Sequence, residues 1–106
     1  MQAEAAPTAA IEFAGATGTP SPNDIVMHWR GTCTNPGQAV RVHITFGHGD
    51  PVCRGDGTYE FGYMVYDYRQ AGLEFGKSFD YRGFVANPEF RAVDGSAVLG
   101  GYRPSF

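Results

Sequence analysis

The stretch Gln38-Ala-Val-Arg-Val-His-Ile-Thr-Phe46 alternates apolar and polar side chains, and the two cysteines of the chain, Cys33 and Cys53, lie on either side of it. An alternation with a period of two is typical of a β-strand that buries one face. A disulfide between the cysteines would require an oxidising compartment, so the pair indicates a small secreted β domain. The buried face of this strand is predicted to consist of Val40, Val42, Ile44 and Phe46.

The preceding segment, Ile25–Cys33, holds the single tryptophan of the chain. Its odd positions, which include Trp29 and Cys33, are expected on the core face. The residues Asn35-Pro36-Gly37-Gln38 place Pro and Gly at the two central positions of a type II turn. The two segments are therefore predicted to form a hairpin. A Cys33–Cys53 disulfide would clip that hairpin shut and stabilise the fold by about 3 kcal/mol.

Two free thiols are the alternative, one of them a nucleophile with His28 or His43 as its base. No cysteine-enzyme signature surrounds either cysteine, so a structural disulfide is predicted. The spacing is shorter than that of the inter-sheet bridge of an immunoglobulin domain. A link between adjacent strands, or from a strand to a loop, fits it better.

The rest of the chain also favours strands. The segment Thr58–Tyr68 carries aromatic residues at both parities, which indicates a central strand covered on both faces. Residues 15–24 are rich in Gly and Pro and are expected to form a loop. The remaining predicted strands are Ile11–Phe13, Leu73–Tyr81, and the pair Phe90–Val93 and Ser96–Leu99, which an Asp94-Gly95 turn would join in a tight hairpin.

No segment shows helical periodicity over three turns. About seven short strands separated by turn signals predict an all-β fold, a small antiparallel β-sandwich, with a small barrel as the alternative. Residues 1–10 are small and polar and are expected to be a flexible N-terminus, while residues 11–106 are expected to form a single β domain.

Composition excludes several classes of function. The formal net charge of −3 argues against nucleic-acid binding and against attachment to anionic membranes. No apolar run approaches the length of a transmembrane helix. The first residues read like the start of a mature secreted protein, and one lysine beside seven arginines suggests a GC-rich bacterial source.

His43, His48 and Asp50 are of the residue types that bind zinc or copper. However, His43 is predicted on an exposed strand face, and the other two in a Gly-rich turn. They are therefore interpreted as solvated side chains. The sequence predicts neither a metal site nor a cofactor.

No catalytic residue is assigned either. The chain lacks a Gly-x-Ser-x-Gly motif, and its carboxylates have no spacing that places an acid and a base within reach. The tripeptide Arg54-Gly55-Asp56 matches an integrin-binding motif but is interpreted as a turn. Whether the chain is an enzyme stays open, with a binding protein favoured.

The aromatic residues Tyr59, Phe61, Tyr63, Tyr66 and Tyr68 are candidates for a binding platform. Tyrosines on a rigid sheet offer a large contact area at a small entropic cost. One parity must face the core, so only one subset is expected to be available.

The segments Ala16–Pro20, Trp29-Arg30, Ala39–Gly49 and Pro51–Arg54 together resemble the tendamistat-type α-amylase inhibitors of actinobacteria, over about residues 16–65. The resemblance implies a small secreted β-sandwich that presents a Trp-Arg-Tyr triplet from a hairpin turn to the amylase active site. Trp29 and Arg30 match the first two positions, and Gly31 stands where the family has tyrosine. Two of the four family cysteines have no counterpart here, and by alignment Cys33 and Cys53 would belong to different family bridges.

We therefore predict a secreted binding protein that inhibits an extracellular hydrolase through a loop of the clipped hairpin. A carbohydrate-binding module that uses the aromatic strand face is the alternative, and a small secreted hydrolase is a second alternative. The expected partner is a protein or a glycan. The predicted partner-binding residues are Trp29, Arg30, Tyr63, Tyr66 and Tyr68.

Overall fold

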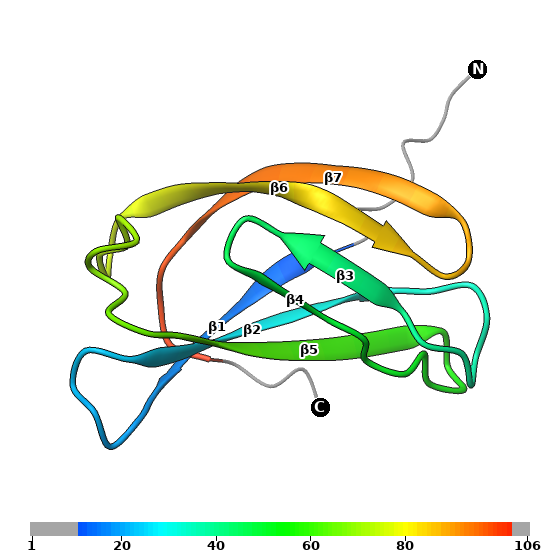
Figure 1. Ribbon diagram of the computed structural model, residues 1–106, viewed down its shortest axis with the longest axis horizontal. Coiled ribbons are helices and arrows are strands. Elements are labelled where there is room, and N and C mark those ends of the chain that lie inside the picture. The colour runs from blue at the N-terminus through cyan, green and yellow to red at the C-terminus, as the bar shows by residue number, and fades with distance from the viewer. Residues whose placement is uncertain (1–10, 103–106) are drawn as a thin grey trace.

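The computed structural model describes residues 11–102, and these form two antiparallel sheets packed face to face (Figure 1). One sheet has three strands in the order β1 (Glu12–Gly18), β2 (Ile25–Thr32) and β5 (Thr58–Val65). The other has four strands in the order β4 (Gly47–Gly49), β3 (Arg41–Ile44), β6 (Ser78–Ala86) and β7 (Phe90–Val98). The predicted β-sandwich is confirmed, and the sheets do not close into a barrel. The described residues contain no helix, and so none that could cross a membrane.

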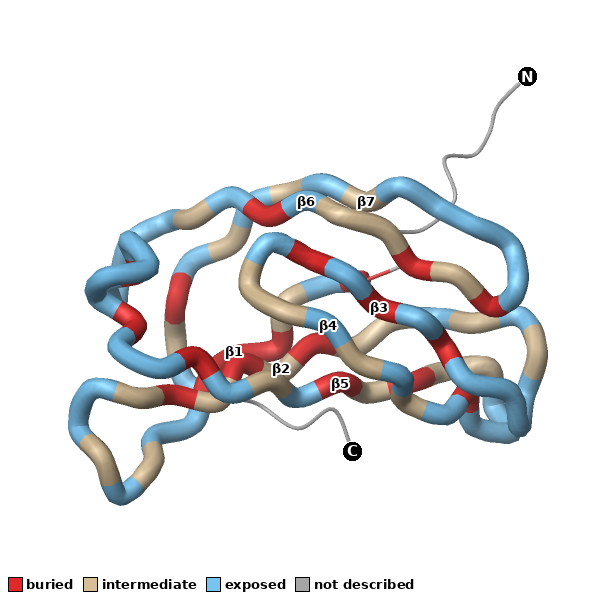
Figure 2. Tube along the Cα trace, in the orientation of Figure 1, coloured by how far each residue is buried: buried red, intermediate tan, exposed pale blue. Residues whose placement is uncertain are grey.

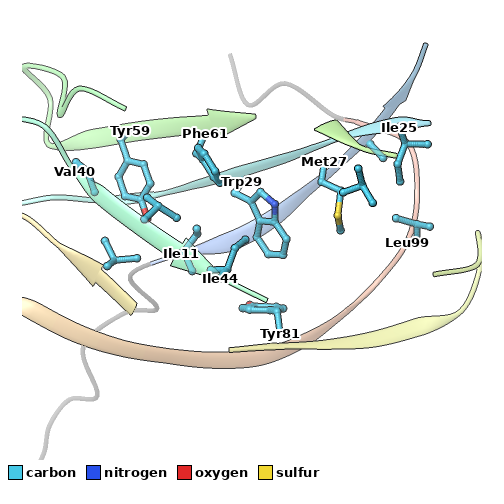
Figure 3. Packing of buried hydrophobic residues seen from close by; sticks show 14 of the residues in the cluster. Ile11, Ile25, Met27, Trp29, Val40, Ile44, Tyr59, Phe61, Tyr81 and Leu99 are labelled. Carbon is cyan, nitrogen blue, oxygen red and sulfur yellow. The ribbon is translucent and has the colours of Figure 1, made fainter. Parts of the chain in front are cut away.

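The core lies between the two sheets, and buried positions alternate with exposed ones along the strands (Figure 2). Trp29 is only 1% exposed, as its parity predicted. Figure 3 shows it projecting from the three-stranded sheet toward Tyr81 of β6. The ring centroids of Phe13 and Tyr81 lie 5.1 and 4.9 Å from that of Trp29, and those of Phe46 and Phe79 lie 6.3 Å away. One aromatic cluster therefore holds the sheets together.

The sheets approach most closely where β4 lies against β5. A side chain at Gly47 would collide with the ring of Tyr63, and a side chain at Gly49 with the ring of Phe61. The missing side chains on β4 thus let two aromatic rings pack directly on its backbone.

Cys33 and Cys53 form the predicted disulfide, with their Cα atoms 5.9 Å apart. The bond joins the residue that follows β2 to the segment between β4 and β5. Backbone hydrogen bonds reinforce it: Gly37 N donates to Cys53 O at 2.8 Å, and Cys53 N to Gln38 O at 2.9 Å.

The predicted hairpin between the segments on either side of Asn35–Gln38 is wrong. The turn itself forms, with Gln38 N donating to Asn35 O at 3.1 Å and a positive φ of 87° at Gly37. However, β2 pairs along its whole length with β5, and β3 pairs with β4 and β6. The chain therefore crosses from one sheet to the other at this turn.

The side chain of Asn87 helps to hold this crossover in place. It is buried, its Nδ2 donates to Ala39 O at 2.9 Å, and its Oδ1 accepts hydrogen bonds from the backbone N–H groups of Thr34 and Asn35. The crossover is thus tied both to the disulfide and to the residue that follows β6.

Three further predictions are corrected by strand pairing. Asp94-Gly95 is not a turn, because β7 runs through it and pairs with β6. Residues 15–18 belong to β1 and not to a loop, because they pair with β2. The segment 58–68 is not a central strand, since β5 ends at Val65 and lies at the edge of its sheet.

The predicted flexible segment 1–10 lies outside the described residues.

After β7 the chain returns to the three-stranded sheet and lies beside β1. Ala16 N donates to Gly100 O at 2.8 Å, and Tyr102 N donates to Ala16 O at 3.0 Å. These residues cover the edge of β1.

Candidate binding face on the four-stranded sheet

A row of rings crosses the outer face of the four-stranded sheet, one from each strand. His48 of β4 pairs in register with His43 of β3, which in turn pairs with Phe84 of β6, and Phe90 of β7 lies diagonally beyond. Successive ring centroids are 4.9, 5.0 and 4.9 Å apart. We call these four residues the ring row.

The first three rings of the ring row are nearly parallel. The interplanar angle is 13° between His48 and His43 and 9° between His43 and Phe84. The faces of the inner rings are therefore occupied by each other. Phe90 is 66% exposed, so this terminal ring still offers an apolar surface to a ligand.

A polar hollow of about 560 Å³ lies on the same sheet face, two residues beyond Phe84 along β6. Arg82 of β6 lies opposite Asp94 of β7, and Asp80 lies opposite Ser96. Directly opposed side chains on one sheet face have Cβ atoms about 5 Å apart. Within the described part of the chain, these four side chains make no hydrogen bond or ion pair with one another, so their polar groups remain available. We call the cavity that these four side chains help to line the polar hollow.

Thr45 borders the polar hollow and fixes its geometry. Its hydroxyl accepts a hydrogen bond from Arg82 N at 3.0 Å and donates one to Arg82 O at 3.2 Å. This holds the backbone of Arg82 against the end of β3 while the guanidinium stays exposed.

The floor of the polar hollow is formed by Tyr81 and Gly95, which pair across β6 and β7. The Tyr81 ring is on the core side. Burial raises the pKa of its hydroxyl, and the nearby carboxylates of Glu12 and Asp94 raise it further. The Tyr81 hydroxyl therefore stays protonated at ordinary pH.

The predicted partner-binding residues do not gather at one site. Trp29 is in the core, and Arg30 lies in the middle of β2 on the opposite face, where its Nε is 3.3 Å from Glu12 Oε2. Neither residue is in a hairpin turn, so this chain does not present Trp29 to a partner from a turn.

The three predicted tyrosines are separated as well. Tyr63 is half-buried against Gly47, and Tyr68 is buried in the turn after β5. Tyr66 is 73% exposed and stands apart from the ring row. The odd residues of β5 face the core, whereas its outward positions carry Glu60, Gly62 and Met64, so β5 has no aromatic platform.

A second, smaller pocket lies on the outer face of the three-stranded sheet. The Tyr102 ring stacks on His28 with centroids 3.9 Å apart, and Thr17 Oγ1 is 2.9 Å from His28 Nε2. Partial burial lowers the pKa of His28, and the Glu60 carboxylate opposes this shift. The hydroxyl, imidazole and carboxylate do not amount to a catalytic triad, since Glu60 makes no hydrogen bond to His28 among the described residues.

The Arg54-Gly55-Asp56 tripeptide forms a closed turn. Gly57 N donates to Arg54 O at 2.9 Å, and the Thr58 hydroxyl donates to Asp56 Oδ1 at 2.6 Å. The Arg54 guanidinium donates to the same hydroxyl at 3.0 and 3.2 Å. The side chains of Arg54 and Asp56 are therefore both hydrogen-bonded to Thr58. This agrees with the prediction that the tripeptide forms a turn.

Of the candidate metal ligands, His48 is not in a turn. It belongs to β4 and stacks on His43. The described residues contain no group of three or more His, Cys, Asp or Glu side chains arranged to hold a metal ion. The ring row could not be predicted from the sequence, because its members lie far apart in the chain.

The only local signal for it was the alternation in residues 38–46, which predicts that His43 points outward.

Three comparisons, with protein-family models, with curated proteins and with solved structures, returned no match to this chain.

Proposed function

We propose that this protein is a secreted carbohydrate-binding module and that its glycan lies on the ring row and in the polar hollow. The observation that carries the proposal is the position of Arg82, which lies directly opposite Asp94 and two residues from Asp80 on the same strand face. Its guanidinium makes no hydrogen bond or ion pair among the described residues, and the rings of Phe84 and Phe90 continue the same sheet face. The disulfide supports an extracellular location.

The chemistry of the site suits a polyhydroxylated ligand. Carboxylates of Asp80 and Asp94 accept hydrogen bonds from sugar hydroxyls, and Arg82 donates to hydroxyl oxygens. Hydrogen bonds to charged groups are about twice as strong as neutral ones. The free face of Phe90 provides the apolar surface on which the C–H groups of a sugar ring can pack.

The rigidity of the face also favours binding. The rings are held by register on four hydrogen-bonded strands, and the inward faces of the two central strands, β3 and β6, are anchored in the core by Val42 and Val85. A preorganised site loses little conformational entropy when the ligand binds.

A glycan array followed by calorimetry on the best ligand tests the proposal. Phe90→Ala and Asp94→Asn should each weaken binding by about tenfold or more, the equivalent of one lost contact. Tyr66→Ala is the matched control, because it removes an aromatic residue of similar exposure from a different part of the surface. An array on which the wild type binds no glycan overturns the proposal, and so does equal binding by all three variants.

Inhibition of an extracellular hydrolase is the second candidate. The observation in its favour is the rigid end of the sandwich. There, residues 34–39 are held beside Cys53 by the Cys33–Cys53 disulfide and by backbone hydrogen bonds, and they are tied to the end of β6 by the Asn87 side chain. The neighbouring Val52 is 59% exposed there, and a rigid exposed loop can fill an enzyme cleft.

Amylase and protease assays with the wild type and a Val52→Asp variant test this second candidate. The variant should lose inhibition if this end is the contact surface. Trp29→Ala is not a useful probe, because it would remove the centre of the core. If the wild type inhibits no enzyme, the candidate is rejected.

A further inference from the structure

His43 and His48 face each other across the β3–β4 hairpin. They are directly paired in register, on either side of a two-residue turn at Thr45 and Phe46. Both are exposed, and their ring centroids are 4.9 Å apart at an angle of 13°. The two imidazoles thus lie parallel, with neighbouring edges open to solvent.

The pair is held in place from both sides. Phe84 stacks on the other face of His43, with centroids 5.0 Å apart. On the far strand, His48 stands between Gly47 and Gly49, whose backbones are covered by the rings of Tyr63 and Phe61. The hairpin therefore cannot shift without disturbing the core, which keeps the imidazoles together.

The spacing of the two paired residues lets both imidazoles reach one metal ion, since directly opposed side chains have Cβ atoms about 5 Å apart. A metal–nitrogen bond of about 2.1 Å puts two imidazole nitrogens on one ion about 3.0–3.4 Å apart, for angles between square and tetrahedral. In the stacked arrangement the nitrogen lone pairs, which lie in the ring planes, run nearly parallel. Metal binding therefore requires both side chains to rotate about their χ angles until one nitrogen of each points at the ion, and this movement leaves the backbone register unchanged.

The donor set defines the class of metal. Imidazole nitrogen suits Cu(II), Ni(II) and Zn(II), whereas Mg(II) and Ca(II) require oxygen ligands. The described residues supply no third His, Cys, Asp or Glu ligand to such a site, so water would fill the other positions. The Irving–Williams order places Cu(II) above Ni(II) and Zn(II) for a nitrogen site.

We propose that His43 and His48 form a two-histidine site that binds a divalent transition-metal ion, Cu(II) in preference to Zn(II). Both residues belong to the ring row, but the proposal does not rest on glycan binding, because it is tested with the metal alone.

The experiment titrates the full chain with CuCl2 or ZnCl2 while NMR records the imidazole C–H signals of all three histidines. Zn(II) should shift the signals of His43 and His48 together with one saturation curve, and Cu(II) should broaden the same two first. His28 lies on the other sheet under Tyr102 and should be unaffected at the same concentrations. This residue-level readout separates the site from metal binding at the N-terminal amine.

Variants complete the test. His43→Asn and His48→Asn should each lower the affinity for Zn(II) by about tenfold or more, because one ligand is lost. His28→Asn is the matched control and should retain the wild-type affinity. Both substituted side chains of the site are exposed, and circular dichroism checks that each variant is folded. Non-saturable shifts in the wild type, or a loss confined to one of the two site variants, overturn the proposal.

Discussion

Gly95 lies directly opposite Tyr81, and the Tyr81 hydroxyl occupies the space that a side chain at position 95 would need. A Cβ atom built on Gly95 would be 2.7 Å from that oxygen. The glycine is therefore required by packing between β6 and β7, and not by a turn.

Gly95→Ala should lower the free energy of unfolding by about 1–3 kcal/mol, because the added methyl group forces Tyr81 out of its place against Trp29. Urea unfolding measures this. Gly18→Ala is the control, since no atom lies within 4 Å of a Cβ at that position. Equal stability of the two variants would contradict this account of Gly95.

Trp29→Ala should destabilise the protein by about 3–5 kcal/mol, because it leaves a cavity at the centre of the aromatic cluster. Trp29→Phe should cost considerably less. The buried Trp29 Nε1–H has no hydrogen-bond partner among the described residues, so its removal breaks no bond. Urea unfolding of the two variants should show this order, and an equal loss in both would indicate that the indole N–H contributes to stability.

Reduction of the Cys33–Cys53 disulfide should lower the free energy of unfolding by about 3 kcal/mol, the chain-entropy value for a loop closed by residues 20 apart. A Cys33→Ser, Cys53→Ser double variant should match the reduced wild type. Intact mass with and without reductant confirms the starting state. If the oxidised and reduced proteins unfold at the same urea concentration, the bond does not stabilise this fold.

The stability of the protein should fall as the pH drops through about 6.5, and His28 should account for part of the fall. Burial lowers the pKa of His28 from its ordinary value of 6.5, so the folded state binds its proton less readily than the unfolded chain. Its contribution is therefore fully present above pH 6.5 and is lost as the pH falls toward the lower pKa of the folded protein. Melting temperatures across this range should depend less on pH in His28→Gln than in the wild type. Identical pH dependence in both would contradict this role.

Local patterns predicted the faces of the strands well. Trp29, Val40, Val42 and Ile44 are buried as their parity indicated, and His43 is exposed. These predictions succeeded because side-chain alternation is a property of a single strand. They failed where a strand ended early, as β5 does at Val65, since Tyr66 and Tyr68 then lie outside the alternation.

Such local patterns could not predict the candidate site. No pattern in the sequence singles out Phe84, and Asp94 was predicted to lie in a turn. Each became part of a binding face only because β6 lies between β3 and β7. Strand order depends on which long-range pairings bury the most apolar surface, and no short segment encodes it.

The sequence by itself determined the all-β class, the inward faces of β2 and β3 and the single possible disulfide, because these follow from alternation within a strand and from the presence of only two cysteines. Only the tertiary structure decided that β2 and β3 lie in different sheets, and that His48, His43, Phe84 and Phe90 form one row. The physical reason is that hydrogen-bonded pairing between distant strands is selected by the packing of the whole core, so it arises only when all seven strands assemble.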